Sequence, residues 1–493
     1  MDINKLKNAL VYERSLNPER TNATLERILE VFENVIDDQK IIQGLKENVE
    51  ITDLRKPISI SEADKIVNYI DTLHLPRDII QEIIDQLNYS EISTDEAIEI
   101  HKKYKIPVSK LEKDIVPVRG EGSWILDTKG RWFLDMDSNY SATNLGMDNK
   151  ELARGLYNQA NLLISMKEDR VQIARTRFLK EIEQMMPTGL NYFYWQNSGG
   201  EAVDKAIKIA KAYTNSKDVV AFKNGFHGRT HGAVAVTWNK DYRKPFLLDD
   251  EDWVHFADFN DIDSVRKVLD ETDARIIIME VIQGEEAGNL PADPEFIEQL
   301  WYLKEERNLI IIDDEVQAGF GRTAVEKGDW FACDSYDVVP DIMVIGKSFG
   351  GGYPVTAVVT NDEISNAMKP GYDGSTFGGN PMAMTSALIA TRQMRERDVT
   401  ANVVERSKQF RKGLKSLKEK HSVIEEIRGR GLMISFSLGS EENVSKTQDS
   451  LRELGVKSSL STDKYLRILP PTVISRGEVE YFLDKLDMAL EKL

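Results

Sequence analysis

The sequence of 493 residues lacks thiol pairs, long apolar runs and an excess of basic charge. Its single cysteine, Cys333, cannot form an internal disulfide, so nothing in the chain requires an oxidising compartment. No apolar run approaches the ~18 residues of a membrane-spanning helix, and the N-terminus has no apolar signal core. The net charge of −18 argues against a broad nucleic-acid surface, because phosphates are bound by basic stripes. We therefore expect a cytoplasmic protein with no membrane or nucleic-acid partner.

Glycine and tryptophan are scarce in residues 1–108, which contain one glycine, Gly44, and no tryptophan. Apolar residues recur there at helical spacing, for example at positions 25, 28, 29, 32, 35 and 36. A helix start is expected at 61–64, and Pro76 permits a new helix after it. We interpret residues 1–108 as an N-terminal helical extension, and we find no ligand-binding constellation in it.

Short bulky runs alternate with helical stretches and glycine-rich breaks from about residue 190. Runs of this length, separated by helices, are typical of strands buried on both faces of a parallel or mixed sheet. The runs are 192–195, 219–222, 276–281, 309–312, 342–345 and 357–360. A polar turn at 127–130 also predicts a hairpin between 124–126 and 132–134.

The remaining segments predict a second, smaller domain. Beyond residue 386, long amphipathic helices are interrupted by strand-like runs at 434–438 and 466–469. We therefore expect an α/β protein with a large mixed-sheet domain at 171–385. A small α+β domain would combine 109–170 with 386–493.

A serine and two glycines separate one expected strand from a helix. In WQNSGGEA (195–202), Ser198, Gly199 and Gly200 offer an anion free backbone N–H groups and the positive end of a helix dipole. The alternative is an ordinary glycine-rich turn. The segment GSTFGGNP (374–381) is either another anion cradle or an ordinary loop.

Two further strand ends carry charged side chains. Asp313, Asp314 and Glu315 directly follow 309–312, where an α/β sheet offers its ligand crevice. A carboxylate there needs a cation, a metal or a protonated ring nitrogen, unless it is only a satisfied helix cap. Lys347 follows the run 342–345, and desolvation would lower its pKa and make it a nucleophile, unless its amine reaches solvent.

Two phosphate cradles, an acid for a pyridinium nitrogen and a Schiff-base lysine are together the parts of a pyridoxal phosphate site. These motifs occur in the order found in class III, or ω-, aminotransferases. The chain from about residue 115 to its C-terminus resembles that family. The resemblance implies a fold-type I pyridoxal-phosphate-dependent transferase, and we identify no metal site.

The resemblance assigns cofactor contacts to residues of these motifs. Lys347 would hold pyridoxal 5'-phosphate as a Schiff base and move the proton between substrate and cofactor, while Asp314 would pair with the pyridinium nitrogen. His227 is either a further contact or only structural. The other expected contacts are Ser198, Gly199 and Gly200 at the phosphate, Phe226 on the ring face, Gln317 at the phenolic oxygen, and Thr376 from the partner subunit of a homodimer.

Substrate recognition is expected to depend on arginine, whose bidentate fork suits a carboxylate. Arg467 matches the family arginine that binds the α-carboxylate of glutamate or 2-oxoglutarate. In the ornithine subgroup a glutamate screens this arginine while the amine donor is bound. Here the segment 283–288 is one residue longer than expected, and either Glu285 or Glu286 could be that gate.

Two other residues match the pair that holds the α-carboxylate of ornithine in ornithine aminotransferase. They are Tyr140 and Arg229, although Tyr140 could instead be a core aromatic and Arg229 belongs to a motif shared widely in the class. The sequence departs from the family pattern at 147–150, at Gly200, which lacks a hydroxyl, and at Val281. These departures leave the cofactor assignment intact and weaken the substrate assignment.

The closer resemblance, to ornithine, acetylornithine and 4-aminobutyrate aminotransferases, implies a specific reaction. The ω-amino group of an ornithine- or lysine-like diamino acid would be transferred to 2-oxoglutarate. The alternatives are an amino-acid racemase or epimerase on the same scaffold, and a binding protein built on an inactive aminotransferase. The N-terminal extension could enlarge the dimer interface, cover the pocket mouth or recruit another protein.

Overall fold

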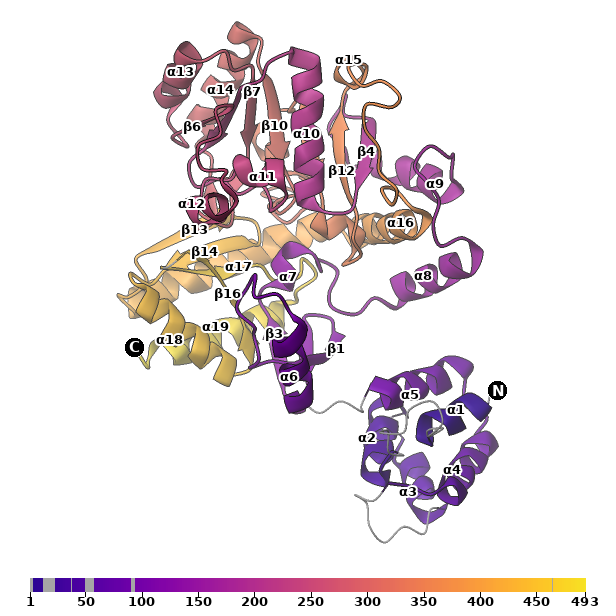
Figure 1. The fold of residues 1–493 in the computed structure, drawn as a ribbon. Helices are drawn as coiled ribbons and strands as arrows, with labels where there is room; N and C mark the ends of the chain where they lie inside the picture. The colour runs from indigo at the N-terminus through magenta and orange to yellow at the C-terminus, as the bar shows by residue number, and fades with distance from the viewer. Residues whose placement is uncertain (1–2, 12–22, 37, 49–56, 90–93, 463) are drawn as a thin grey trace. The chain divides into compact units, whose positions relative to one another are not determined.

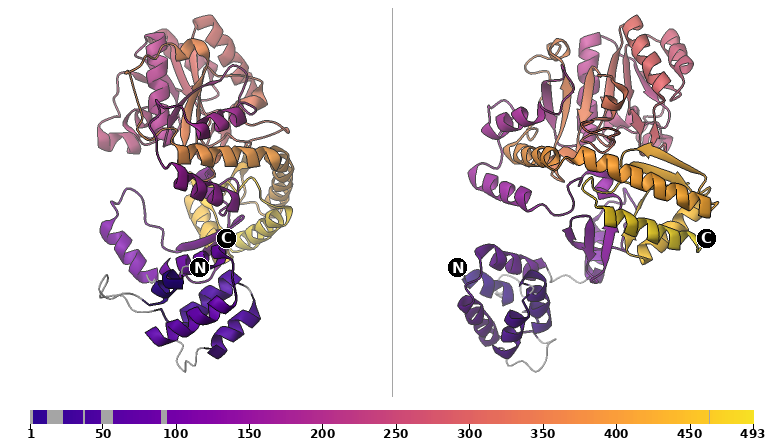
Figure 2. Two further views of the ribbon diagram at one scale, coloured as in Figure 1. Left: turned by 90° about the vertical axis from the view of Figure 1, so that its right-hand side faces the viewer. Right: turned by 180° about the vertical axis from the view of Figure 1, so that it is seen from behind.

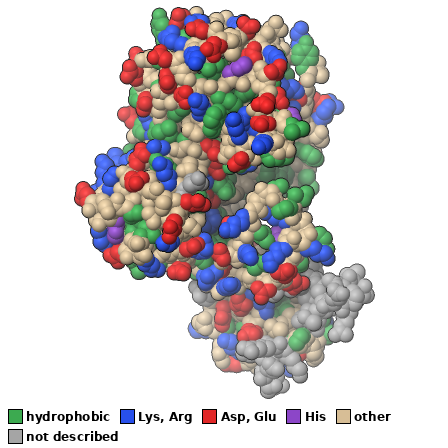
Figure 3. Space-filling model, turned by 60° about the vertical axis from the view of Figure 1, so that its left-hand side comes forward, with side chains coloured by type: hydrophobic (Ala, Val, Ile, Leu, Met, Phe, Trp, Pro, Cys, Tyr) green, Lys and Arg blue, Asp and Glu red, His purple; other side chains and the backbone are tan. Residues whose placement is uncertain are grey.

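The computed structural model describes residues 3–11, 23–36, 38–48, 57–89, 94–462 and 464–493. The chain divides into two compact units, Met1–Val116 and Pro117–Leu493. Within the described ranges, no helix is both long and apolar enough to cross a membrane. On the face drawn in Figure 3, acidic and basic side chains are intermixed, and neither forms a continuous stripe.

The first unit is helical, as its periodicity predicts. Five helices bury apolar side chains in one core, which draws on residues from Leu6 to Leu87 and on none from the second unit. They are α1 (Ile3–Leu10), α2 (Leu25–Ile36), α3 (Gln39–Asn48), α4 (Ile60–Thr72) and α5 (Arg77–Tyr89). The sixth, α6 (Thr94–Tyr104), buries no side chain.

The expected helix start at 61–64 is two residues too late. The N-cap of α4 is Ser59, whose hydroxyl accepts from the Glu62 backbone N–H at 3.3 Å, and the Glu62 carboxylate accepts from the Ser59 N–H at 2.5 Å. This reciprocal capping box satisfies two N–H groups that would otherwise lack partners at the helix end.

The second unit contains a seven-stranded mixed sheet, which confirms the α/β prediction (Figure 1). The spatial order is β4 (Tyr192–Gln196), β12 (Thr356–Thr360), β11 (Ile342–Ile345), β10 (Ile310–Asp314), β7 (Ile276–Met279), β5 (Val219–Phe222) and β6 (Val254–Ala257). Only β12 runs antiparallel to its neighbours in this sheet. The sequence pattern predicted six of these strands and missed β6.

Helices cover both faces of this sheet, which is why most residues of its strands are apolar. Ile276 and Ile278 of β7 pack in the core cluster of α10 (Gly199–Thr214). Ile277 and Met279 alternate with them and pack with α13 (Ile262–Glu271) and α14 (Pro294–Arg307). Because side chains along a strand alternate between the two faces of the sheet, β7 contributes alternate residues to the core on each face.

Two smaller sheets complete the second unit. The expected hairpin is present as β2 (Trp124–Asp127) and β3 (Trp132–Asp135), flanked by β1 (Pro117–Glu121) and β15 (Val456–Lys457). The other sheet has the order β13 (Glu426–Arg430), β14 (Met433–Ser437), β17 (Tyr465–Ile468) and β16 (Ser459–Thr462). Because β3 pairs with β15, the segment after residue 117 shares a sheet with the C-terminal part of the chain.

Long helices connect and cover these sheets, and in Figure 2 the orange helices α16 and α17 run beneath the large sheet. These helices are α8 (Lys150–Leu162), α9 (Ile173–Ile182), α16 (Pro381–Glu396), α17 (Val399–Lys420), α18 (Glu441–Glu453) and α19 (Arg476–Leu490). The expected domain division at 385/386 falls inside α16, so a boundary there would lie in a continuous helix.

The remaining elements are short. They are α7 (Ser138–Ser141), α11 (His231–Ala235), α12 (Lys240–Arg243), η1 (Lys244–Phe246), β8 (Ile282–Gln283), β9 (Leu290–Pro291), η2 (Ala332–Tyr336), η3 (Lys347–Gly350) and α15 (Asp362–Ser365).

Candidate active site

A pocket of about 530 Å³ lies where the parallel strands of the large sheet end. The carboxyl ends of β4, β5, β7, β10 and β11 each deliver a segment to it, as expected for an open α/β sheet. Its lining includes Ser198, Gly199, Gly200, Phe226, His227, Arg229, Thr230, Glu280, Glu285, Asp314, Gln317, Lys347 and Thr356. Most residues expected from the sequence therefore meet in one cavity.

Lys347 stands at the start of η3, directly after β11 and Gly346. Its φ of +46° is a left-handed conformation that a long side chain rarely adopts. Desolvation lowers the pKa of its amine, although Glu285 and Asp314 oppose the shift. The lowered pKa leaves more of the amine uncharged, so it can act as a nucleophile or accept a proton.

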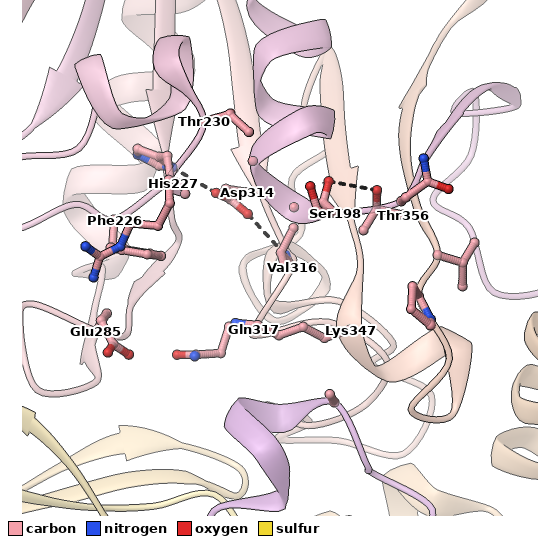
Figure 4. A pocket seen from close by; sticks show the side chains of 18 of the residues that line it. Ser198, Phe226, His227, Thr230, Glu285, Asp314, Val316, Gln317, Lys347 and Thr356 are labelled. Carbon is pink, nitrogen blue, oxygen red and sulfur yellow. Dashed lines mark hydrogen bonds and ion pairs between the residues drawn. The ribbon is translucent and has the colours of Figure 1, made fainter. Parts of the chain in front are cut away.

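Asp314 lies between His227 and the backbone of the next turn (Figure 4). Its Oδ2 is 2.9 Å from His227 Nδ1, and its Oδ1 accepts from the Val316 N–H at 3.2 Å. The His227 side chain is fully buried. This contact orients Asp314 in the pocket and gives His227 a positioning role, while a direct contact of His227 with the cofactor stays a prediction.

The other two carboxylates of the Asp-Asp-Glu run do not enter the pocket. Asp313 and Glu315 alternate with Asp314 along β10 and its end, so they face the opposite side. Glu315 Oε1 accepts from the Cys333 N–H at 2.9 Å. Burial raises the pKa of Glu315 to about 7 and that of Asp313 well above its usual value.

Glu280 is a pocket residue that the sequence interpretation missed. It lies inside the apolar run 276–281, and that position of a carboxylate among buried residues is the signal that could have found it. Its Oε2 accepts from the Phe226 N–H at 3.3 Å. Burial and the nearby Asp314 raise its pKa well above the usual value.

The N-terminus of α10 forms a cradle of the expected kind. Ser198 is the N-cap, its hydroxyl accepting from the Glu201 N–H at 3.3 Å, and Thr356 Oγ1 donates to the Ser198 carbonyl at 3.0 Å. Gly228 approaches so closely that a Cβ there would lie 2.7 Å from Gly200 Cα. Residue 228 therefore has no room for a side chain, whereas a methyl group on residue 200 would require a small shift of Thr230.

Thr230 is a second residue that the sequence interpretation missed. A Cβ on Gly200 would lie 3.0 Å from Thr230 Oγ1, so the threonine hydroxyl stands where the side chain missing from Gly200 would point. Three buried polar atoms of the pocket have no hydrogen-bond partner among the described residues: Thr230 Oγ1, His227 Nε2 and Gln317 Oε1. Such groups are costly unless a polar ligand satisfies them.

Arg467 and Glu285 form an ion pair at the edge of this pocket. The Arg467 side chain is fully buried; its Nε donates to Ser459 Oγ at 3.2 Å, while its Nη2 has no partner in the described part of the chain. Glu286 instead accepts from Asn239 Nδ2 at 3.0 Å. Of the two glutamates left open by the sequence, Glu285 is therefore the one that contacts Arg467.

Tyr140 and Arg229 are not brought together by any contact among the described residues. The Arg467 guanidinium lies 5.1 Å from the centre of the Tyr140 ring, whereas Arg229 lies 3.5 Å from that of Tyr242 and 5.3 Å from that of Phe226. Tyr140 is 48% exposed, so it is not a core aromatic. Thr376 is exposed and is not one of the residues that line the pocket.

Tyr140 belongs to a left-handed turn, α7, in which φ is positive for all four residues, Ser138–Ser141. Such a conformation costs about 1–2 kcal/mol for each non-glycine residue, so the surroundings must hold it. The Ala142 N–H donates to the Ser138 carbonyl at 2.8 Å. Ser138 Oγ donates to the Leu469 carbonyl at 2.6 Å, and Ser141 Oγ donates to the Gln317 carbonyl at 3.0 Å.

Arg322 is the centre of the network that holds this turn. Its Nη2 donates to Ser138 Oγ at 3.1 Å and also to Asn144 Oδ1, and its Nε donates to Ser141 Oγ. Its Nη1 donates to the Leu432 carbonyl at 3.0 Å. The guanidinium is fully buried, forms no ion pair with a described carboxylate, and has its pKa lowered by burial to about 9.

The mixed sheet with one antiparallel strand and a lysine at its carboxyl edge is the fold of the type I pyridoxal-phosphate-dependent transferases, which this chain shares. The chain matches the class III aminotransferase family over residues 106–490 and belongs to that family, whose members depend on pyridoxal phosphate.

Two relatives and one solved structure illustrate this similarity. The chain is 35% identical to the acetylornithine aminotransferase of Archaeoglobus fulgidus, over 78% of this chain and 97% of that protein. It is 34% identical to the LysW-aminoadipate semialdehyde/glutamate semialdehyde transaminase of Sulfurisphaera tokodaii, over 75% and 93%. An ornithine aminotransferase structure from Toxoplasma gondii, with partial occupancy of pyridoxal phosphate at its active site, matches with a TM-score of 0.75 at 25% identity, over 81% and 94%.

The network around Arg322 predicts a large loss of stability on its removal. Arg322→Ala leaves buried oxygens of the left-handed turn without donors. We expect the free energy of unfolding, measured in urea, to fall by about 3 kcal/mol. Arg322→Lys should lose less, because one ammonium replaces part of the fork. As a control, Arg476→Ala removes an arginine that is 79% exposed and should change stability by less than about 0.5 kcal/mol. Equal stabilities of Arg322→Ala and Arg476→Ala would show that the turn does not depend on Arg322.

Proposed function

We propose that this aminotransferase moves the ω-amino group of an ornithine- or lysine-like diamino acid to 2-oxoglutarate, with pyridoxal phosphate held at Lys347. The observation that carries the proposal is the contrast between two pocket arginines. Arg467 is paired with Glu285, whereas Arg229 forms no ion pair with any described carboxylate. The relatives' names, which refer to acetylornithine and semialdehydes, support the same class of reaction.

The pocket fits pyridoxal phosphate by the chemistry of its donors. The glycine cradle at the N-terminus of α10 suits a phosphate, and the unpartnered Thr230 Oγ1 and Gln317 Oε1 suit a polar ligand. Ser198, Gly199, Gly200 and Thr230 would hold the phosphate. When bound, the cofactor supplies an electron sink for charge on the carbon next to the reacting nitrogen.

The chain's own residues would orient that cofactor and move the proton. Phe226 would cover one face of its ring, and Asp314, held by Val316 and His227, would keep a negative charge at the ring nitrogen. The amine of Lys347 would attach the cofactor and then carry a proton between neighbouring atoms. Its lowered pKa suits this role, because an uncharged amine must be available to accept the proton.

The arginines would let one pocket accept two different substrates. While Glu285 covers Arg467, a donor would place its carboxylate at Arg229 and its ω-amine near Lys347. For 2-oxoglutarate, a carboxylate would displace Glu285 and use both the released Nη1 and the unpartnered Nη2 of Arg467. Bidentate recognition of this kind favours arginine over lysine.

Racemisation is the alternative on the same scaffold. It needs no keto-acid acceptor, so a screened Arg467 would have no purpose in it. The transaminase names of the relatives also favour transfer over racemisation.

We also propose a homodimer in which Thr376 reaches the partner's site. Exposed apolar side chains on two segments offer a candidate contact surface that includes Thr376. They are Leu162, Ile164, Val171, Ile173, Tyr372 and Phe377, with Val171 95% exposed. The two segments that form it are joined, because Glu168 accepts from the Ser375 N–H at 3.2 Å and Arg175 donates to the Gly379 carbonyl at 2.9 Å. Exposed patches of this kind mark interfaces. The lone buried Cys333 supports a cytoplasmic location for the assembly.

Turnover with defined substrates tests the proposed reaction. Glutamate should form from L-ornithine or L-lysine only when 2-oxoglutarate is present, and the protein should absorb near ~420 nm with pyridoxal phosphate. Lys347→Ala should lose both properties, while Lys327→Ala, at a position 72% exposed, should keep them. Formation of a D-amino acid without an acceptor would favour the racemase, and lack of any band with added cofactor would exclude the cofactor assignment.

Sedimentation tests the assembly and the N-terminal unit together. Among the described residues, the core of the first unit contains no residue of the second. A chain beginning at residue 106 should therefore fold and sediment as a dimer, as we expect of the full chain. Val171→Asp should weaken the dimer, because an isolated carboxylate is costly in an apolar interface. A single-chain mass for the full protein, or loss of dimer only on removal of the first unit, would contradict this arrangement.

The glycine cradle predicts a loss of cofactor affinity for Gly200→Ala. The added methyl group would lie 3.0–3.2 Å from three atoms of Thr230, so the threonine must move from the proposed phosphate site. We expect the dissociation constant of pyridoxal phosphate, measured by equilibrium dialysis, to rise about tenfold. In Thr230→Ala protein the same change at residue 200 should have a smaller effect. A cofactor affinity unchanged by both substitutions would show that neither residue touches the phosphate.

A further inference from the structure

We propose that Glu286 binds the α-ammonium group of the amino donor, so that the site selects free diamino acids over Nα-acylated ones. This inference depends on the proposed function and adds to it the class of donor. The residue has no role in the ion pair of Glu285 with Arg467. Its hydrogen bond with Asn239 places it instead at the start of α12, the helix whose Tyr242 packs against Arg229.

Arg229 is the first component of the proposed head-group site. Its guanidinium lies 3.5 Å from the centre of the Tyr242 ring, close enough for a cation–π contact, and it lines the pocket. No carboxylate of the described chain forms an ion pair with it, and the residue is exposed. Arg229 can therefore bind a donor's carboxylate without first breaking an ion pair with a described carboxylate.

Glu286 is the second component. It is half-buried and accepts from Asn239 Nδ2 at 3.0 Å, and Asn239 is the N-cap of α12, the helix that carries Tyr242. The Arg229 guanidinium packs on the ring of that tyrosine, and its charge acts on the Glu286 carboxyl. One acidic and one basic side chain are consequently neighbours at this end of α12.

This combination of charges matches an unblocked amino acid. The head group of a free α-amino acid carries a carboxylate and an ammonium on one carbon, whereas an Nα-acyl derivative keeps the carboxylate and replaces the ammonium with a neutral amide. An arginine alone would bind both kinds of molecule. A half-buried carboxylate beside it would favour the cation and leave the amide without a matching charge.

The electrostatics of Glu286 agree with a role in binding a cation. Burial raises the pKa of its carboxyl, and so does Glu285, whereas hydrogen bonds from Asn239 and Tyr242 and the charge of Arg229 lower it. The net effect is a raised pKa, which indicates that the charged form is not fully compensated. An arriving ammonium would supply the missing positive charge.

Three donors that share the same ω-amine isolate the proposed contact. L-Ornithine carries the α-ammonium, 5-aminopentanoate lacks it, and Nα-acetyl-L-ornithine replaces it with an amide. For the wild-type holoenzyme we expect kcat/KM to be at least about tenfold higher for L-ornithine than for either other donor. In Glu286→Gln protein, which keeps a hydrogen-bonding side chain of the same size, this preference should disappear through a higher KM for L-ornithine.

Two further variants and one binding measurement complete the design. Glu286→Asp retains the charge and should lose less of the preference, and Glu298→Gln on the exposed face of α14 should change nothing. L-Norvaline and pentanoate, which have no ω-amine, should compete with the donor. Glu286→Gln should raise the inhibition constant of L-norvaline by about the same factor as the KM of L-ornithine and leave that of pentanoate unchanged.

The outcomes separate this inference from the proposed function. Equal use of the three donors by the wild type, or an equal loss for all three in Glu286→Gln, would overturn the inference alone and make Glu286 a structural partner of Asn239 and Tyr242. If no donor gives glutamate in the presence of 2-oxoglutarate, the proposed function is wrong, and this inference with it.

Discussion

The hydrogen bonds of one buried guanidinium, that of Arg322, hold together segments beside the pocket that are distant in the sequence. Arg322 donates to the left-handed turn at Ser138–Ser141 and to the Leu432 carbonyl, which precedes β14. Ser141 and Asn144 in turn contact Ser348, the neighbour of Lys347, because Ser348 Oγ donates to the Ser141 carbonyl at 2.8 Å and Asn144 Nδ2 lies 2.6 Å from that hydroxyl. Burying a charge without a paired carboxylate costs free energy. Here the hydrogen bonds of the guanidinium offset that cost, and they also fix segments distant in sequence in one geometry.

The geometry of these segments determines how charge is distributed around the amine of Lys347. Asp314, Glu280 and Glu285 all lie in the pocket with Lys347, so desolvation and negative charge act on its amine in opposite directions. The result is an amine with a lowered pKa that still has anionic neighbours able to stabilise it when it is protonated. Such a group can gain and lose a proton with little reorganisation, which agrees with the proton transfer proposed for Lys347.

Much of this site could be predicted from the sequence because its parts are local. Lys347 and Asp314 each follow an apolar strand run, and the Ser-Gly-Gly turn precedes a long helix, so three short segments carried their own signal. Glu280 was hidden inside an apolar run. The role of Arg322 could not be predicted, since its partners lie 110 to 184 residues away in the sequence. The same limitation left Glu285 and Glu286 equivalent, because only tertiary contacts with Arg467 and Asn239 distinguish them.

The loop that carries both glutamates gives two consecutive side chains separate contacts. Its start is fixed, because a Cβ on Gly284 would lie 2.1 Å from Gln317 Oε1, and its end turns through Gly288 and Asn289, both with positive φ. Between these points Glu285 and Glu286 are consecutive and point to different partners, Arg467 and Asn239. The ion pair of Glu285 with Arg467 and the hydrogen bond of Glu286 with Asn239 therefore coexist in one short loop. The two roles proposed for these glutamates are compatible because neither contact uses the other side chain.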